Sequence, residues 1–175
     1  MSTARLRIIG SARRRVDGRA KVTGQTKFAD DIVLPRMLHC KLLRSAVPHA
    51  RIVRIDPTRA LAHPGVHLVL TGRDLPIPYG ILPVSQDEHA LAIDRVRFVG
   101  DPVAAIVARD EATAFDALEL IDVEYQALPT FGDPEESLAL GREAGAPGVI
   151  NDPRIHAYGA GGNIHKIVSL GFGNI

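Results

Sequence analysis

The segment from residue 97 to residue 125 constrains the fold of this 175-residue chain more than any other. Residues 103–107 form a short apolar run rich in β-branched side chains, and a glycine and a proline mark its start, which predicts a buried strand. Apolar residues then recur at roughly helical spacing behind Asp110 and Glu111, acidic residues that suit the positive end of a helix dipole. With an extended stretch at 122–125, the segment predicts a strand, a short amphipathic helix and a strand, and it contains no catalytic chemistry.

The residues before this segment predict the order strand, strand, short helix, strand. The expected strands lie at 37–43, 51–56 and 66–70, and the second alternates with period two as a half-buried strand should. One helical turn fits 58–61, and the prolines and glycines of 74–83 predict an exposed loop. Beyond Pro129 the pattern weakens to a helix start at 133–140 and a glycine-rich linker. These elements together predict an α+β fold.

Composition and charge indicate a globular domain with no general affinity for nucleic acid. Hydrophobic residues make up 46% of the chain and charged residues 23%, and 21 Lys and Arg against 20 Asp and Glu give a formal charge of +1. The basic residues gather in the first 21 positions, around Arg13, Arg14 and Arg15. No aromatic residue is interleaved there to stack on bases, which favours a solvated leader or an arm on a partner over a nucleic-acid site.

The single cysteine, Cys40, excludes an intrachain disulfide framework and indicates a reducing compartment. Its apolar neighbours predict a buried structural thiol. The first thirty residues contain no apolar signal segment, and no apolar run approaches the roughly 20 residues that span a bilayer. We therefore expect a cytoplasmic protein with no membrane span.

The search for catalytic patterns predicts no site. His63 and His67 are four residues apart, but the proline and glycine between them prevent the helix that a zinc-protease motif needs. The glycine-rich run 159–162 follows no clear strand and opens no helix, so we interpret it as a flexible linker instead of a phosphate-binding loop. His89 with Asp87 or Glu88 is the one remaining candidate for hydrolytic chemistry.

A series of short motifs in a fixed order resembles a known family. From about Val16 to about Pro134 the chain resembles the N-terminal α/β hammerhead domain of the large, molybdopterin-binding subunit of the xanthine oxidase/aldehyde oxidase family of molybdenum hydroxylases. Residues 76–83 and 91–96 look most like the 4-hydroxybenzoyl-CoA reductase branch. The motifs are Val16-Asp17-Gly18, Lys21-Val22-Thr23-Gly24, Phe28-Ala29-Asp30-Asp31, Leu43-Arg44-Ser45, Pro48-His49-Ala50-Arg51-Ile52, Pro64-Gly65-Val66, Thr71-Gly72, the run from Val96 to Ala104, Val123-Glu124-Tyr125 and Leu128-Pro129.

The resemblance implies a fold and a division of the chain. The expected fold is an α/β hammerhead, with a mixed sheet and short packed helices, followed by an incomplete start of the molybdopterin-binding domain. The expected parts are a basic leader at 1–15, the hammerhead at 16–134, a linker at 135–162 and a truncated start of the next domain at 163–175. The abrupt end suggests a fragment, a split subunit or a truncated product.

The resemblance implies no catalytic, cofactor-binding or metal-binding residue in this chain, because the motifs that hold the molybdenum pterin lie beyond the hammerhead in the family. Molybdopterin, 2Fe-2S clusters and FAD are implied only for the complete complex. We interpret Gly24, Gly72 and Gly100 as turn positions that benefit from a positive φ. His49 and Arg51 are interpreted as the start of a strand, with contact to a neighbouring iron–sulfur or flavin subunit as the alternative.

Three functions remain open at this point. The first is a scaffold part of a molybdenum-dependent oxidoreductase, of the xanthine dehydrogenase or 4-hydroxybenzoyl-CoA reductase type, that is not catalytic alone. Its partners are the remaining molybdopterin-binding domains or subunit, an iron–sulfur subunit and a FAD subunit. The second is a stand-alone hammerhead module that binds a partner protein through the loop at 74–89, without redox activity. The third is a small independent hydrolase that uses His89.

Overall fold

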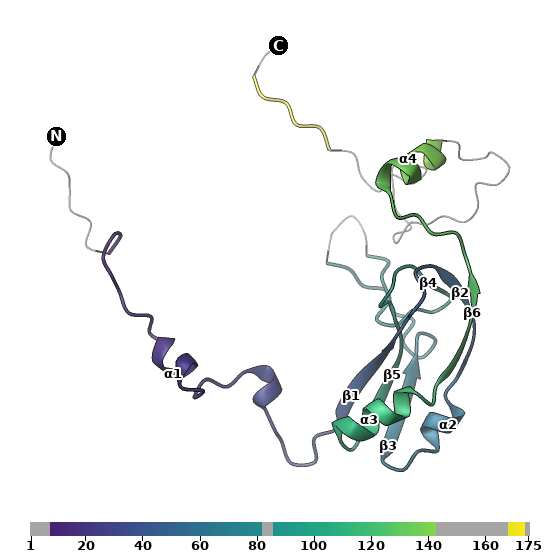
Figure 1. Cartoon of the computed structure of the whole chain (residues 1–175), viewed down its shortest axis with the longest axis horizontal. Helices are drawn as coiled ribbons and strands as arrows, with labels where there is room; N and C mark the ends of the chain where they lie inside the picture. The colour runs from purple at the N-terminus through teal and green to yellow at the C-terminus, as the bar shows by residue number, and fades with distance from the viewer. Residues whose placement is uncertain (1–7, 82–85, 143–167, 174–175) are drawn as a thin grey trace. The chain divides into compact units, whose positions relative to one another are not determined.

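The computed structural model describes residues 8–81, 86–142 and 168–173 (Figure 1). The chain divides into two compact units, Met1–Met37 and Leu38–Ile175, and each is described here by itself. We refer to the described part of the second unit as the body.

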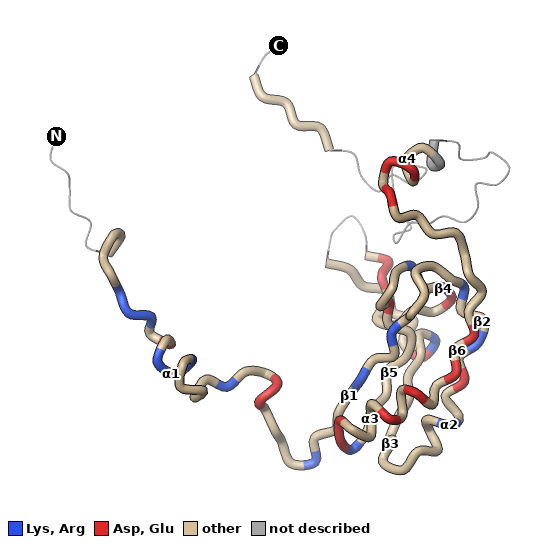
Figure 2. Tube along the Cα trace, in the orientation of Figure 1, with Lys and Arg blue, Asp and Glu red and all other residues tan. Residues whose placement is uncertain are grey.

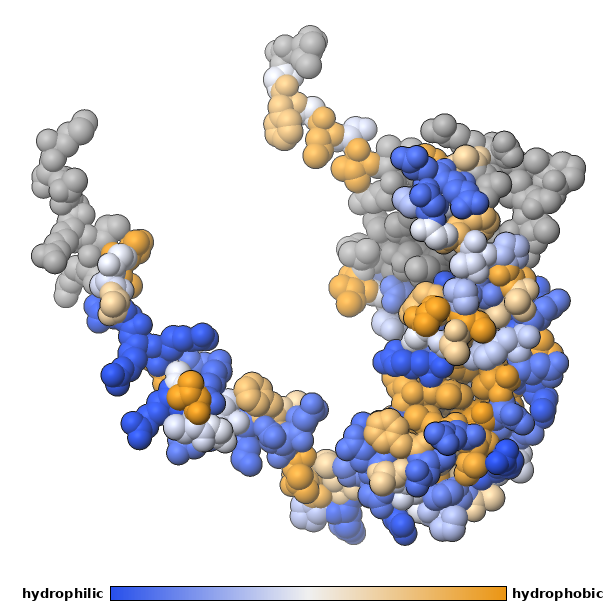
Figure 3. All heavy atoms as spheres, viewed as in Figure 1, coloured by the Kyte–Doolittle hydropathy of each residue, from blue (hydrophilic) through white to orange (hydrophobic). Residues whose placement is uncertain are grey.

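The first unit contains two short helical elements and no strand among its described residues. The helix α1 spans Gly18–Val22 and the 3-10 helix η1 spans Ala29–Asp31. An ion pair between Lys21 and Asp17 (2.6 Å) and the positive φ of Gly24 (69°) shape the turn around α1. Figure 2 shows several Lys and Arg positions along the trace of this segment. Its large apolar residues are also exposed, as Figure 3 shows.

The body contains six strands in two antiparallel sheets, one with the order β1-β5-β3 and the other with the order β4-β2-β6. The α+β hammerhead expectation is confirmed, but the expected mixed sheet is wrong, since every pairing among the named strands is antiparallel. The elements are β1 (His39–Arg44), β2 (Ala50–Asp56), α2 (Thr58–Leu61), β3 (Val66–Thr71), β4 (Arg95–Val96), β5 (Pro102–Ala108), α3 (Glu111–Leu118), β6 (Asp122–Ala127) and α4 (Pro134–Arg142).

The main core lies between α3 and one face of the sheet β1-β5-β3. Alanines on both sides allow close approach, and Ala104 and Ala108 of β5 and Ala114 and Ala117 of α3 are completely buried. Asp110 caps α3, because its carboxylate accepts a hydrogen bond from the backbone N–H of Thr113 at 2.7 Å. Hydrogen bonds from the side chain and the backbone N–H of Thr113, with a smaller contribution from Arg109, lower the pKa of Asp110 to about 2.

A second core cluster joins the two sheets. It contains Ala50 of β2, Ala92, Val96 of β4 and Val103 of β5, all of them buried. Its position explains how a strand of only two residues, β4, is held: Val96 is completely buried and pairs with Ala50.

The predicted strands and helices of the body are confirmed within one or two residues at most ends, including the helix start near residue 133. The sequence missed β4, which is too short to show a period, and α1, which has no apolar periodicity. The prediction of a buried Cys40 is wrong, because β1 alternates between half-buried and exposed side chains and places Cys40 on its exposed side. Most of the expected linker and of the expected start of a next domain lie outside the described residues, and the predicted domain boundaries stay predictions.

Candidate functional site

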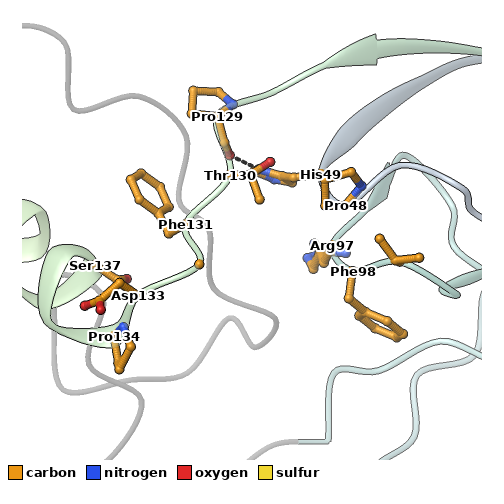
Figure 4. Close-up of a pocket in the computed structure, with 12 residues that line it drawn as sticks. Pro48, His49, Arg97, Phe98, Pro129, Thr130, Phe131, Asp133, Pro134 and Ser137 are labelled. Atoms are coloured by element: carbon orange, nitrogen blue, oxygen red, sulfur yellow. Dashed lines mark hydrogen bonds between the residues drawn. The ribbon is translucent and has the colours of Figure 1, made fainter.

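A cavity of about 470 Å³ lies beside the ends of strands of the sheet β4-β2-β6. Three segments form its walls: residues 48–49 before β2, residues 97–99 after β4, and residues 129–134 after β6, with Ser137 of α4 beside them. Figure 4 shows Phe131 and Asp133 on one side of the cavity and Arg97 and Phe98 on the other. We take this cavity as the candidate site because it brings together segments that are far apart in the sequence.

His49 joins two of these walls. Its Nδ1 donates a hydrogen bond to the carbonyl oxygen of Pro129 at 2.6 Å, and its own carbonyl accepts one from the N–H of Leu128 at 3.0 Å. The residue is 5% exposed, and its Nε2 is buried without a hydrogen-bond partner among the described residues. Because Nδ1 faces a carbonyl oxygen it must donate, and the buried Nε2 has no direct access to a ligand in the cavity. The geometry of His49 fits a structural role, in which the side chain links the residues before β2 to those after β6, and does not fit a general base.

Arg97 and Asp101 form the second wall and its support. The N–H of Arg97 donates a hydrogen bond to the Asp101 carboxylate at 3.0 Å, and the Arg97 Nε is buried without a partner among the described residues. Burial raises the pKa of Asp101, against the smaller lowering effects of the hydrogen bond and the charge of Arg97. The partly buried carboxyl of Asp101 therefore holds the loop around Arg97 in place through the hydrogen bond that it accepts from the Arg97 N–H.

The third wall depends on Asp133. Its carboxylate accepts hydrogen bonds from the N–H groups of Glu135 (2.7 Å) and Glu136 (3.0 Å), which starts α4. This capping explains why the acidic run after Gly132 forms a helix as the sequence predicts. Oδ1 of this carboxylate, which lines the cavity, is thus already used by the helix start.

Ser45 connects the walls to the first sheet. Its N–H donates to the carbonyl of Asp101 and its carbonyl accepts from Gly100, each at 2.8 Å, while its hydroxyl donates to the carbonyl of Val47 at 2.8 Å. Burial raises the pKa of Tyr125, which also forms a hydrogen bond with Ser45. The residues Arg44-Ser45 and Gly100-Asp101 of the sequence motifs therefore meet in space, mainly through backbone hydrogen bonds of Ser45.

The arrangement suits binding and architecture better than catalysis. The described residues include no group of three or more His, Cys, Asp or Glu that could hold a metal ion. A conventional iron–sulfur cluster needs about four cysteine thiolates, and the chain has one cysteine. The two buried nitrogens of His49 and Arg97 are closed to the cavity. The described residues therefore offer no set of ligands for a molybdenum ion or an iron–sulfur cluster, and we derive no reaction step through one.

The structure separates the residues that the sequence singled out. His49 lines the cavity, whereas Arg51 pairs with Arg95 and Gln126 in the sheet β4-β2-β6 and does not line it. Neither His89 nor its acidic neighbours line the cavity; Glu88 instead forms an isolated bridge with Tyr79. The run 159–162 lies outside the described residues.

The turn interpretation is confirmed for two of the three glycines. Gly24 has a φ of 69° and Gly100 a φ of 94°. Gly72 has no positive φ and is needed for a different reason, because a Cβ there would collide with the backbone of Leu91 and Ala92. Arg97 and the wall at 129–134 were not predicted as site residues, because their only signal in the sequence is their place inside or beside the motifs.

Within the part of the chain that the structure describes, no helix has the length and apolar character required to cross a bilayer.

Comparison with known proteins agrees with this geometry. Residues 23–129 match the family model described as "Aldehyde oxidase and xanthine dehydrogenase, a/b hammerhead domain". The chain is 46% identical over 129 residues to a probable xanthine dehydrogenase subunit of Bacillus subtilis (strain 168), covering 73% of this chain and 17% of the relative. It is 38% identical over 171 residues to the putative xanthine dehydrogenase molybdenum-binding subunit of Escherichia coli (strain K12), covering 92% and 21%.

A solved structure extends the agreement to three dimensions. Quinoline 2-oxidoreductase from Pseudomonas putida 86 superimposes with a TM-score of 0.68 at 40% identity, over 74% of this chain and 17% of that chain. The chain thus spans about a fifth of the length of the relatives it matches. The finer assignment to the 4-hydroxybenzoyl-CoA reductase branch stays a prediction. With the matched family model covering more than half of its residues, the chain belongs to the aldehyde oxidase and xanthine dehydrogenase family and contains its a/b hammerhead domain.

Proposed function

We propose that this chain is the N-terminal scaffold part of the large subunit of a molybdenum-dependent hydroxylase or dehydrogenase, and that it does not catalyse alone. The observation that carries the proposal is the 38% identity over 92% of this chain to a protein named as a molybdenum-binding subunit, of which the chain covers only 21%. The chain corresponds to one structural part of such a subunit. Its role is then to position other parts.

The cavity and its supports agree with such a role. His49, Ser45 and Asp101 use their polar groups to join the two sheets and the segment after β6, so they leave few groups for chemistry. Cofactors perform the difficult electron chemistry in redox enzymes, while the protein supplies orientation and electrostatics. We assign molybdopterin, 2Fe-2S clusters and FAD to the other domains or subunits of the complete complex, and this chain contributes geometry.

The proposed partners are the remaining molybdopterin-binding domains, an iron–sulfur subunit and a FAD subunit. Several relatives are themselves named as subunits, including one of a dehydrogenase complex from Paenarthrobacter nicotinovorans. We place this complex in the cytoplasm, a location supported by the use of a single, unpaired cysteine in the chain.

Purification of the tagged chain from its native host under mild conditions tests the proposal. Companions are identified by mass, and molybdenum and iron are quantified in the same sample, with an unrelated tagged protein of similar size as the control. We expect a longer companion polypeptide together with stoichiometric molybdenum. A metal-free monomer that unfolds cooperatively would contradict the proposal and would favour the stand-alone hammerhead module.

A further inference from the structure

One face of the sheet β1-β5-β3 presents two cross-strand rows of apolar side chains. Directly paired residues of antiparallel strands point to the same side of a sheet, and successive residues alternate between the two sides. The pairing register of β5 with β1 and with β3 therefore defines the rows without ambiguity. The rows are Cys40–Val107–Leu68 and Leu42–Ala105–Leu70, and we call these six residues the open face.

The opposite face of the same sheet is the covered one. The row between the two apolar rows is Lys41–Ile106–Val69, of which Ile106 and Val69 belong to the core beneath α3. Lys41 forms an ion pair with Glu111 of α3 and lies over the Phe115 ring. The single helix α3 thus covers one side of the sheet and is not available to cover the other.

Three of the four outer-strand members of the open face are exposed, whereas Leu70 and Val107 are half-buried and Ala105 at the centre is buried. Neither core cluster of the described residues includes any of its six members. Leu42 is 37% exposed and Leu68 is 43% exposed, and Cys40 is exposed as well. Monomeric proteins rarely leave a contiguous apolar surface uncovered, and burial stabilises by roughly 25 cal/mol per Å² of apolar area.

The composition of the open face indicates a permanent neighbour. No member of the two rows is charged, and the nearby Arg44 side chain is directed to the carbonyl of Gly100 by a hydrogen bond of 2.9 Å. Permanent interfaces resemble a protein core cut in half, whereas transient ones are about as polar as the rest of the surface. An uncharged sheet face therefore fits a partner that stays in place.

We propose that the open face is the surface on which the remainder of the large subunit packs, through an apolar surface of its own. This inference rests on the proposed function. The relatives contain roughly four fifths of their length beyond the part that this chain matches. A segment of the same polypeptide acts at a high effective concentration, which gives it an advantage over a second copy of the chain or a separate protein.

Cys40 provides a direct readout because it is the only cysteine of the chain and lies within the open face. The chain is labelled with a maleimide alone and after co-expression with the complementary part of the Bacillus subtilis relative, from which the matched region has been removed and the cysteines replaced. Alone, Cys40 should react at a rate close to that of the urea-unfolded chain. In the complex, it should react at least about tenfold more slowly, because reaction then requires local opening.

Charged substitutions test the surface independently of the cysteine. Leu42→Glu and Leu68→Glu place a carboxylate in the apolar rows and should abolish co-purification with the complementary part. Val53→Glu and Leu61→Glu are the matched controls, since Val53 (49% exposed) lies on β2 and Leu61 (50% exposed) on α2, away from the open face. The controls should co-purify as the unmodified chain does. Circular dichroism verifies that each variant is folded, and if the first two are not, Cys40 labelling of the unmodified chain decides.

The possible results separate this inference from the proposed function. Association with a fully reactive Cys40, or association that survives both open-face substitutions in folded variants, overturns the inference and leaves the scaffold function intact. Failure of the parts to associate at all contradicts both. Slow labelling of the chain alone, together with a dimeric mass, assigns the open face to a second copy and also overturns the inference.

Discussion

Replacement of Gly72 by alanine should destabilise the body, although the φ of Gly72 is not in the left-handed region. A Cβ at this position would lie 2.7 Å from the carbonyl carbon of Ala92 and 2.8 Å from the carbonyl oxygen of Leu91. These are backbone atoms and cannot move aside by a rotamer change. The N–H of Ala92 is also bonded to the carbonyl of Pro102 at 2.7 Å, which ties this segment to β5.

The expected cost of Gly72→Ala follows from this geometry. Overpacking of a well-ordered interior costs about 1–3 kcal/mol, and the fixed backbone places this site at the upper end, about 3 kcal/mol. Leu91 is only 2% exposed, so a shift of the 91–92 segment also disturbs the cluster that contains Val96. In a domain of this size, a loss of about 3 kcal/mol lowers the melting temperature by roughly 6–12 °C.

Urea unfolding of the 175-residue chain, followed by far-UV circular dichroism, measures this loss. Gly132→Ala is the matched control, because nothing lies within 4 Å of a Cβ at Gly132 and its φ is not in the left-handed region. We expect the control to change the free energy of unfolding by less than about 1 kcal/mol. An equal loss in both variants, or a loss below about 0.5 kcal/mol for Gly72→Ala, would refute the argument from close backbone approach.

Three further changes have defined outcomes. The pKa of Asp110 falls from 3.8 to about 2 on folding, so the stability that this carboxylate contributes is present above pH 4 and is lost as the pH falls toward 2. Asp110→Asn should therefore flatten the pH dependence of the urea midpoint between these two pH values. Folding raises the pKa of Asp101, so the ionised form of this carboxyl destabilises the folded state as the pH rises. Asp101→Asn keeps an acceptor for the N–H of Arg97 and should therefore be neutral or stabilising at pH 7. Asp101→Ala leaves that N–H unpaired and should cost about 1–3 kcal/mol in urea unfolding. Ala117→Leu inserts volume between α3 and β5 where Ala117 is completely buried and should cost about 1–3 kcal/mol, measured by the melting temperature.

The sequence predicted the elements of the body well where local signals agree with the tertiary structure. The apolar run of β5 and the acidic cap of α3 formed as predicted, but the face of α3 that is buried consists of Thr113, Ala114 and Ala117, whereas Phe115 is 53% exposed. The arrangement of strands into two antiparallel sheets was not predictable in this way. β5 pairs with β1 and β3, strands more than thirty residues away, and no local pattern specifies such partners.

The error at Cys40 has a specific physical cause. The sequence analysis placed Cys40 in the interior because its neighbours are apolar, which assumes that an apolar strand is buried on both sides. In β1, alternate residues face α3, and the others belong to the open face, which no core cluster of the described residues covers. An apolar residue on an uncovered face therefore gives the same sequence signal as a core residue, and only the structure separates the two.

The candidate site shows why the sequence motifs predicted a family and no chemistry. The segment Arg44-Ser45 leaves the sheet β1-β5-β3, and Gly100-Asp101 connects β4 of one sheet to β5 of the other. Backbone hydrogen bonds between Ser45 and Gly100-Asp101 join these two segments. His49 hydrogen-bonds Leu128 and Pro129 and so holds the chain after β6 in place. Backbone geometry restricts the residue types at these points. Ser45 has a small polar side chain whose hydroxyl donates to the carbonyl of Val47, and Gly100 has a positive φ. Motifs of this kind mark the connections between the sheets, so their presence argues for the hammerhead architecture and for no particular reaction.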